Sequence, residues 1–312
     1  MKVESILDCV GDTPLLKVNN IMEKHDLKAN LYVKLEMFNA SGSVKMRIVK
    51  SIILDGINSG KINEDTMIVE ATSGNVGIAL ACLCARLNLK LTIVMPETAS
   101  IERKKLIKLY GANLILTQGH LGMDGAVQEV NNIVKNNKNT FVLSQFNNYL
   151  NPLTHQLTTA REIYDDLAGE VDIVVCGIGS GGTITGIAKY LHMVGETEVI
   201  GVEPTESPLI SKGISGGHKI EGIGANFIPE ILKLDEIDKI ITVDYNQAIN
   251  GVKMLAMLEG VTVGISAGAA FMVGFAEALK SYNYNKNIVV VLADNIERYF
   301  SKTEGGFLWE KT

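Results

Sequence analysis

Short apolar runs alternate along the chain with longer amphipathic segments. The runs are rich in Val, Ile and Leu and show little alternation of apolar and polar residues, which is typical of strands buried on both faces of a parallel sheet. The expected strands cover residues 29–38, 66–71, 90–96, 113–117, 140–145, 172–178, 198–204, 237–243 and 287–294.

The segments between these runs place apolar residues at helical spacing. The clearest expected helices cover residues 43–60, 74–89, 101–111 and 182–195. A strand–helix alternation of this length predicts an α/β fold whose parallel sheets are covered by helices on both faces. One irregular stretch, rich in Gly, Ser and Pro, runs from Glu203 to Pro229. Loops of that length in a compact domain are usually functional or mobile.

The size and composition of the chain limit the classes of protein to which it can belong. It has 312 residues, of which 46% are apolar and 21% charged, as in ordinary globular proteins. Because a single core stops growing at roughly 250–300 residues, we expect two lobes. The formal net charge is −6 without a long basic run, so nucleic acid is not an expected partner. No uncharged apolar run reaches the ~18 residues of a membrane helix, and the first residues lack the apolar core of a signal peptide. We therefore expect a cytoplasmic protein without a membrane partner.

The four cysteines do not have the regular spacing of a metal site. Three of them, Cys82, Cys84 and Cys176, lie inside apolar stretches, and Cys9 lies near the N-terminus. We expect buried free thiols and no bound metal.

A glycine-rich turn, Gly177–Thr183, directly follows an expected strand and precedes an expected helix. Glycines let the backbone wrap around an anion, and the start of a helix offers free N–H groups and a partial positive charge. A phosphate is the natural ligand of such a turn. The letters also match the dinucleotide fingerprint G-x-G-x-x-G, and Glu203 ends the next strand where that fold places its ribose-binding acid. A nicotinamide-dependent dehydrogenase is therefore an alternative.

Two further turns rich in small residues precede helices. Thr72–Gly77 brings two hydroxyls, an amide and backbone N–H groups to a helix start, which suits a carboxylate. A helix cap without a ligand is the alternative, because Ser and Thr are ordinary caps. The third turn, Gly264–Ala270, is by itself most simply a helix entry made of small residues.

Lys45 lies just inside the start of an expected helix, in the sequence FNASGSVKMR. A lysine reacts as an amine when burial lowers its pKa. Taken alone, Lys45 is more simply a solvated lysine on a helix. The presence of the three turns makes it a candidate for a reactive amine.

Together, these four motifs resemble those of the cysteine synthase and cystathionine β-synthase family, the fold type II enzymes that use pyridoxal 5′-phosphate (PLP). The resemblance runs from GDTPLL at Gly11 to ERYFS ending at Ser301. It implies a two-lobed α/β enzyme with parallel-rich sheets flanked by helices, a site between the lobes, and a homodimer. The implied lobes are a smaller, mobile one that carries the substrate-carboxylate loop, 39–147, and a larger one that binds the PLP phosphate, 1–38 and 148–312. The nicotinamide alternative becomes remote, because it explains neither FNASGSVK nor TSGN.

The resemblance implies a role for each motif residue. Lys45 would form the Schiff base with PLP and act as the catalytic base. Asn75 would hydrogen-bond the ring hydroxyl of the cofactor, and Ser266 would face its pyridine nitrogen. The PLP phosphate would be held by Gly179, Ser180, Gly181, Gly182 and Thr183. The substrate carboxylate would be held by Thr72, Ser73, Asn75 and Gln145.

The implied reaction is replacement at the β-carbon of a small amino acid. A Schiff base with PLP makes the α-proton of the substrate acidic, and Lys45, released as an amine, removes that proton. The β-substituent of cysteine, serine or O-acetylserine then leaves, and a sulfur nucleophile adds to the resulting aminoacrylate.

Departures from the family pattern bear on the nucleophile. Val76 stands where the family usually has threonine, and Met46 replaces a frequent aspartate. The sulfide-using branch typically reads QGIGAGF where this chain has EGIGANF, Glu221–Phe227. Glu221 matches the cystathionine-forming branch, and Asn226 adds an amide that could bind a second amino acid. We therefore favour an amino-acid thiol, with hydrogen sulfide released from cysteine and lanthionine or cystathionine formed. The alternative is an O-acetylserine sulfhydrylase that makes L-cysteine from sulfide.

Overall fold

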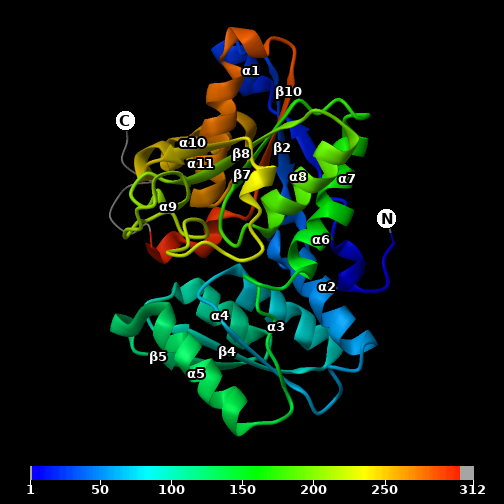
Figure 1. Ribbon diagram of the computed structural model, residues 1–312, viewed down its shortest axis with the longest axis vertical. Coiled ribbons are helices and arrows are strands. Elements are labelled where there is room, and N and C mark those ends of the chain that lie inside the picture. Colours follow the sequence, from blue (N-terminus) through cyan, green and yellow to red (C-terminus); the bar gives the residue numbers. More distant parts are fainter. Residues whose placement is uncertain (1, 303–312) are drawn as a thin grey trace. The chain divides into compact units, whose positions relative to one another are not determined.

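The computed structural model describes residues 2–302, which divide into two compact units. Unit 1 holds Asn39–Ser144, the described part of the first ten residues and the described part of the segment from Glu297 onward. Unit 2 holds Gly11–Phe38 and Gln145–Ile296. Each unit is a sheet flanked by helices (Figure 1).

The unit boundaries differ from those of the expected lobes at both ends of the chain. The sequence assigned both ends to the larger lobe, but their described residues belong to unit 1. Near the N-terminus, Lys50 Nζ donates to Leu7 O at 2.8 Å. Near the other end, Ser301 Oγ donates to Glu102 Oε2 at 2.7 Å. Side-chain hydrogen bonds therefore attach both ends to unit 1. Residues 303–312 of the expected larger lobe lie outside the described residues.

Unit 1 is built on a four-stranded parallel sheet. Its strands, in sheet order, are β5 (Asn113–Thr117), β4 (Lys90–Pro96), β3 (Met67–Ala71) and β6 (Thr140–Phe141). Its helices are α2 (Lys45–Asn58), α3 (Asn75–Leu87), α4 (Ile101–Leu109) and α5 (Gly122–Asn136). On one face, Val69 and Val94 pack against Ala126 and Val130 of α5. On the other face, Ile93 approaches α3, where a Cβ on Gly77 would lie 3.6 Å from Ile93 Cγ2, as expected because successive strand side chains point to opposite faces.

Unit 2 is built on a six-stranded sheet that is parallel except for its first strand. The strands, in sheet order, are β1 (Leu15–Lys17), β2 (Asn30–Leu35), β10 (Asn287–Leu292), β7 (Ile173–Gly177), β8 (Glu198–Pro204) and β9 (Lys239–Val243). The helices are α1 (Asn19–His25), α6 (Leu150–Leu157), α7 (Thr159–Asp166), α8 (Gly182–Val194), α9 (Leu209–Lys212), α10 (Tyr245–Glu259) and α11 (Ile265–Ala278).

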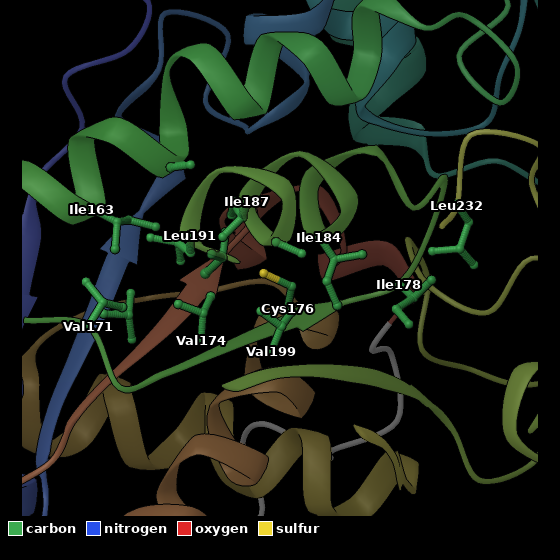
Figure 2. Packing of buried hydrophobic residues seen from close by; sticks show 14 residues of the cluster. Ile163, Val171, Val174, Cys176, Ile178, Ile184, Ile187, Leu191, Val199 and Leu232 are labelled. Atoms are coloured by element: carbon green, nitrogen blue, oxygen red, sulfur yellow. The ribbon is translucent and has the colours of Figure 1, made fainter. Parts of the chain in front are cut away.

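The core of unit 2 covers both faces of this sheet. Figure 2 shows Val174 and Cys176 of β7 in one cluster with side chains of α8, namely Ile184, Ile187 and Leu191. On the opposite face, α11 approaches β10 so closely that a Cβ on Gly274 would lie 2.2 Å from Val290 Cγ2. Residues of one strand thus alternate between two helix layers, which explains why the sequence showed continuous apolar runs.

The predicted α/β architecture with parallel-rich sheets is confirmed. Each expected strand contains an observed one, and the four clearest expected helices are α2, α3, α4 and α8. The strand β1 escaped the sequence analysis because it is short and lies at the sheet edge, antiparallel to β2. The strand β6 is shorter than expected, because from Leu143 onward the backbone N–H groups bond to the Glu70 carboxylate instead of a neighbouring strand.

Cys82, Cys84 and Cys176 are buried free thiols, as predicted, whereas Cys9 is half-buried. Burial raises the pKa of the Cys84 thiol to about 12, which keeps it protonated and unreactive. Within residues 2–302, no three His, Cys, Asp or Glu side chains gather in a way that could hold a metal ion. None of the helices described there is both long and apolar enough to cross a membrane.

Candidate active site

The glycine-rich turn of unit 2 leads from β7 into α8, as the sequence predicted. Gly181 occupies the N-cap position of α8 with a φ of 81°, and no side chain caps this helix. The first N–H groups of a helix have no partner inside it. The turn therefore presents uncapped N–H groups and the positive end of a helix dipole, which fits a phosphate.

Close contacts explain why this turn consists of glycines. A Cβ on Gly179 would lie 2.4 Å from Gly222 O, and one on Gly182 would lie 1.9 Å from Asn151 Oδ1. Neither distance leaves room for a side chain. The turn can thus take this close-packed shape only with glycine at these two positions.

Two buried polar residues of α6 support the turn and were missed by the sequence analysis. His155 Nε2 lies 3.2 Å from Thr183 Oγ1, and its Nδ1 lies 2.9 Å from Thr159 Oγ1. Asn151 Nδ2 donates to Ser180 Oγ at 3.2 Å and to Gln145 O at 2.7 Å. The available signal was the four-residue spacing of Asn151 and His155, which places both on one face of a helix.

The structure brings Ser266 and the EGIGANF segment next to the same turn. Ser266 is buried in the first turn of α11, and a Cβ on Gly222 would lie 3.4 Å from its Oγ. Gly224 N donates to Ile178 O at 2.9 Å. Asn226 is exposed and accepts a hydrogen bond from Ser207 Oγ at 3.5 Å. The predicted phosphate turn, the predicted ring-nitrogen partner and the segment expected to bind the nucleophile are therefore neighbours.

Glu203 has a structural use that removes the main support for a dinucleotide site. It is 1% exposed, and its carboxylate accepts hydrogen bonds from Ile210 N at 2.9 Å and Ser211 N at 3.0 Å. These bonds satisfy the first turn of α9. The acid that the alternative required for a ribose is thus engaged by its own chain.

In unit 1, Lys45 is the first residue of α2 and is half-buried. The loop before it contains two buried hydroxyls, Ser41 Oγ and Ser43 Oγ, that have no hydrogen-bond partner among the described residues. Buried polar atoms normally find partners. A polar ligand near Lys45 fits this arrangement.

The TSGN turn lies between β3 and α3 and is not a side-chain cap. Gly74 occupies the N-cap position of α3, and no side chain bonds to the first helical N–H groups. Thr72 Oγ1 accepts from Gly74 N at 3.2 Å and so shapes the turn itself. The cap alternative is therefore wrong, and the helix start stays suited to a carboxylate. Val76, which departs from the family pattern, is 2% exposed and belongs to the core.

The predicted residues divide between the units. Unit 1 carries Lys45, Thr72, Ser73 and Asn75, and unit 2 carries Gly179–Thr183, Ser266, Asn226 and Gln145. Gln145 was expected in the smaller lobe, but it is the first residue of the segment Gln145–Ile296 of unit 2. Gln145 is buried, and its carbonyl bonds to Asn151.

Arg298 is a further residue that the sequence did not single out. Its Nη1 donates to Asn75 Oδ1 at 2.6 Å, and its Nη2 donates to Ser41 O. The side chain is 8% exposed. Asn75 and Arg298 are 223 residues apart, and no periodic pattern in the sequence connects them.

Glu70 is a buried carboxyl group two residues before the TSGN turn. It is 5% exposed and accepts hydrogen bonds from Leu143 N at 2.9 Å and Ser144 N at 3.3 Å. Desolvation raises its pKa to about 7, although the two backbone hydrogen bonds oppose the shift. Glu70 thus joins the end of β3 to the residues at which the segment Asn39–Ser144 of unit 1 ends.

Comparisons with known proteins agree with this geometry. The model of the family described as "Pyridoxal-phosphate dependent enzyme" matches residues 6–294. Cysteine synthase B of Campylobacter jejuni subsp. jejuni is 47% identical over 304 residues, which cover 96% of this chain and 98% of that protein. The crystal structure of cysteine synthase from Entamoeba histolytica superposes with a TM-score of 0.93 at 39% identity, covering 99% of this chain and 94% of that one. The crystal structure of a hydrogen sulfide-producing enzyme from Fusobacterium nucleatum superposes with a TM-score of 0.91 at 41% identity, covering 96% of this chain and 100% of that one.

The raised pKa of Glu70 predicts a pH-dependent stability. The native state binds the proton of Glu70 more tightly than the unfolded state does. The contribution of this group to the free energy of unfolding is therefore complete below the pKa of the unfolded state and is lost as pH rises through about 7. Between about pH 4 and about pH 8, the free energy of unfolding should fall by about 2–3 kcal/mol relative to Glu70→Gln. Denaturant unfolding at several pH values measures this difference. The exposed Glu64→Gln serves as control and should follow the unmodified protein. Parallel curves for the protein and Glu70→Gln would contradict the assignment.

Proposed function

This chain belongs to the pyridoxal-phosphate-dependent enzymes of the cysteine synthase family, and on that premise we propose that it replaces the β-substituent of a small amino acid with a sulfur nucleophile. The observation that carries the proposal is the uncapped start of α8 behind a turn that admits only glycine at Gly179 and Gly182. Such a turn suits the phosphate of the cofactor. The roles given below to single residues are part of the proposal.

The glycine-rich turn would bind the PLP phosphate, and neighbouring side chains would orient the turn. Backbone N–H groups from Gly179 to Thr183 would donate to the phosphate oxygens, together with the hydroxyls of Ser180 and Thr183. His155 would hold the Thr183 hydroxyl in place, and Asn151 would do the same for Ser180. Hydrogen bonds to a charged phosphate are about twice as strong as neutral ones, so this turn would supply much of the binding free energy.

PLP, when bound, withdraws electrons from the α-carbon of the substrate and makes its α-proton acidic. Lys45 would hold the cofactor through its amine and, once the substrate amine has taken that place, would accept the α-proton at Nζ. The same amine would return the proton after the sulfur nucleophile has added to the β-carbon. Ser266 would face the ring nitrogen as a neutral hydroxyl, which does not retain a proton there as an aspartate would.

The substrate carboxylate would bind at the start of α3. Thr72, Ser73 and Asn75 lie at or before that helix start, where N–H groups and the helix dipole favour an anion. Gln145 would add a side-chain amide. Val76 offers no hydroxyl, and its burial shows that the position is used for the core instead.

The nucleophile is the finer part of the proposal. Cysteine synthesis from O-acetylserine and sulfide is supported by the names of the Campylobacter and Entamoeba relatives. An amino-acid thiol, with hydrogen sulfide released from cysteine, is supported by Glu221 and Asn226, which belong to the segment whose Gly222 lies beside Ser266, and by the description of the Fusobacterium relative as hydrogen sulfide-producing. A second amino acid brings charged groups that need polar partners, and Asn226 is an exposed candidate. We favour the thiol and keep the sulfide reaction as the alternative. The expected homodimer and the mobility of the smaller lobe stay predictions.

The Lys45 assignment predicts a covalent adduct. Purified protein should be yellow, should lose this colour on borohydride reduction, and should then carry PLP on the peptide that contains Lys45. Lys45→Ala should lower turnover at least about 1,000-fold, because holding the cofactor and moving the proton both depend on this amine. Lys50→Ala, one and a half turns along the same helix, should keep the adduct and most of the activity. An adduct mapped to another lysine would refute the assignment.

The thiol preference predicts two products from L-cysteine alone. The enzyme should release sulfide and form lanthionine, measured by sulfide assay and mass spectrometry. Asn226→Gly should slow lanthionine formation more than the release of the first sulfide, measured in a single turnover, since it removes a partner of only the second substrate. Asn226→Asp is the matched control, which keeps a polar group at the same place. Vigorous cysteine synthesis from O-acetylserine and sulfide, without sulfide release from cysteine, would establish the alternative instead.

A further inference from the structure

Arg298 connects the two segments of unit 1 that carry Lys45 and Asn75. One guanidinium nitrogen donates to Asn75 Oδ1 at 2.6 Å, and another donates to the carbonyl of Ser41, four residues before Lys45. At 8% exposure the guanidinium is largely removed from water. A buried, charged donor engaged at two points restricts both segments at once.

The bond to Asn75 determines which way its amide points. The oxygen and nitrogen of an asparagine amide have similar shapes, and their assignment depends on the hydrogen-bond partners. Arg298 has only donors and keeps its charge at any ordinary pH. Only the oxygen of the amide can face it, so Nδ2 of Asn75 must point away from the guanidinium. The nearby positive charge also polarises the amide and makes Nδ2 a stronger donor.

The segment that carries Arg298 is itself anchored. We call Glu297–Lys302 the C-terminal strap. Ser301 N and Oγ donate to the two carboxylate oxygens of Glu102 at 2.8 and 2.7 Å. The Arg103 guanidinium lies 4.6 Å from the centre of the Tyr299 ring, which is 1% exposed. The first turn of α4 thus holds the strap, and the strap holds Arg298 in place.

We propose that Arg298 is a positioning residue that fixes the Asn75 amide so that Nδ2 donates to the ring oxygen of the cofactor. This inference rests on the proposed function, in which Asn75 contacts that oxygen. It adds an arginine from the far end of the chain, which acts through Asn75 without touching the cofactor. Loss of Arg298 would let the amide rotate, and the ring oxygen would then meet an acceptor in part of the molecules.

A double-mutant cycle on cofactor binding tests the inference. PLP is titrated into resolved apoenzyme of the unmodified protein, Arg298→Met, Asn75→Ala and the double variant, and Kd and the absorbance maximum of bound PLP are measured. Arg298→Met should weaken PLP binding by about 10- to 100-fold, the range expected for a hydrogen bond to a charged group. When Asn75 is already alanine, Arg298→Met should weaken PLP binding by less than about 3-fold. The absorbance maximum should shift in the same direction in both single variants.

Two further variants separate positioning from general support of the fold. Arg298→Lys keeps the charge and one donor, and should give an intermediate Kd; it replaces Arg298→Met in the cycle if that variant does not fold. Ser301→Ala removes the Oγ bond to Glu102 but keeps the backbone bond from Ser301 N and the contact between Arg103 and Tyr299. Because these two contacts still anchor the strap, this variant should have a lower thermal midpoint but an unchanged Kd and spectrum of PLP. Equal losses of PLP affinity in Ser301→Ala and Arg298→Met would overturn the positioning role.

The outcomes also distinguish this inference from the function on which it rests. Additive losses in the cycle, with Asn75→Ala alone weakening PLP binding, would refute the role of Arg298 and leave the proposed function intact. An unchanged Kd and spectrum in Asn75→Ala would refute both the Asn75 assignment and the inference. A PLP adduct on a lysine other than Lys45 would overturn the proposed function itself.

Discussion

The helices α3 and α8 each begin without a side-chain cap, directly beyond the end of a parallel strand. A helix start leaves N–H groups without partners, and most proteins satisfy such groups with Ser, Thr, Asp or Asn at the N-cap. Here glycines occupy both N-cap positions, Gly74 and Gly181. The unsatisfied donors and the helix dipoles make both starts suitable for anions. The assignments of a phosphate to α8 and of a carboxylate to α3 both depend on this constraint.

Buried polar side chains hold the two helix starts in shape. From α6, Asn151 bonds to the hydroxyl of Ser180, which precedes α8. His155 bonds to the hydroxyl of Thr183, in the first turn of α8. Arg298 supports the start of α3 in the same way, because it donates a hydrogen bond to Asn75. Each of these residues is less than a tenth exposed, so removing one would leave its partner unsatisfied in a dry environment. The loops that would contact ligands are therefore supported by groups that do not themselves face a substrate.

The sequence predicted the strands and the glycine-rich turns because both depend on local properties. Continuous apolar runs followed from strands covered on both faces, as Val174 and Val290 illustrate. The turn at Gly177–Thr183 was visible because close contacts exclude side chains there. The sequence missed β1, whose short antiparallel pairing has no strong pattern. It also missed Arg298, His155 and the raised pKa of Glu70, because each depends on partners brought together only by the fold. The units differ from the expected lobes for the same reason: side-chain hydrogen bonds between residues far apart in the sequence attach both ends of the chain to unit 1.

A crystal structure of the protein with PLP bound tests the central claim most directly. The account predicts phosphate density within about 2.7–3.2 Å of backbone nitrogens from Gly179 to Thr183, and density that joins the cofactor to Lys45 Nζ. Phosphate density away from the start of α8, or a cofactor joined to a different lysine, would contradict it.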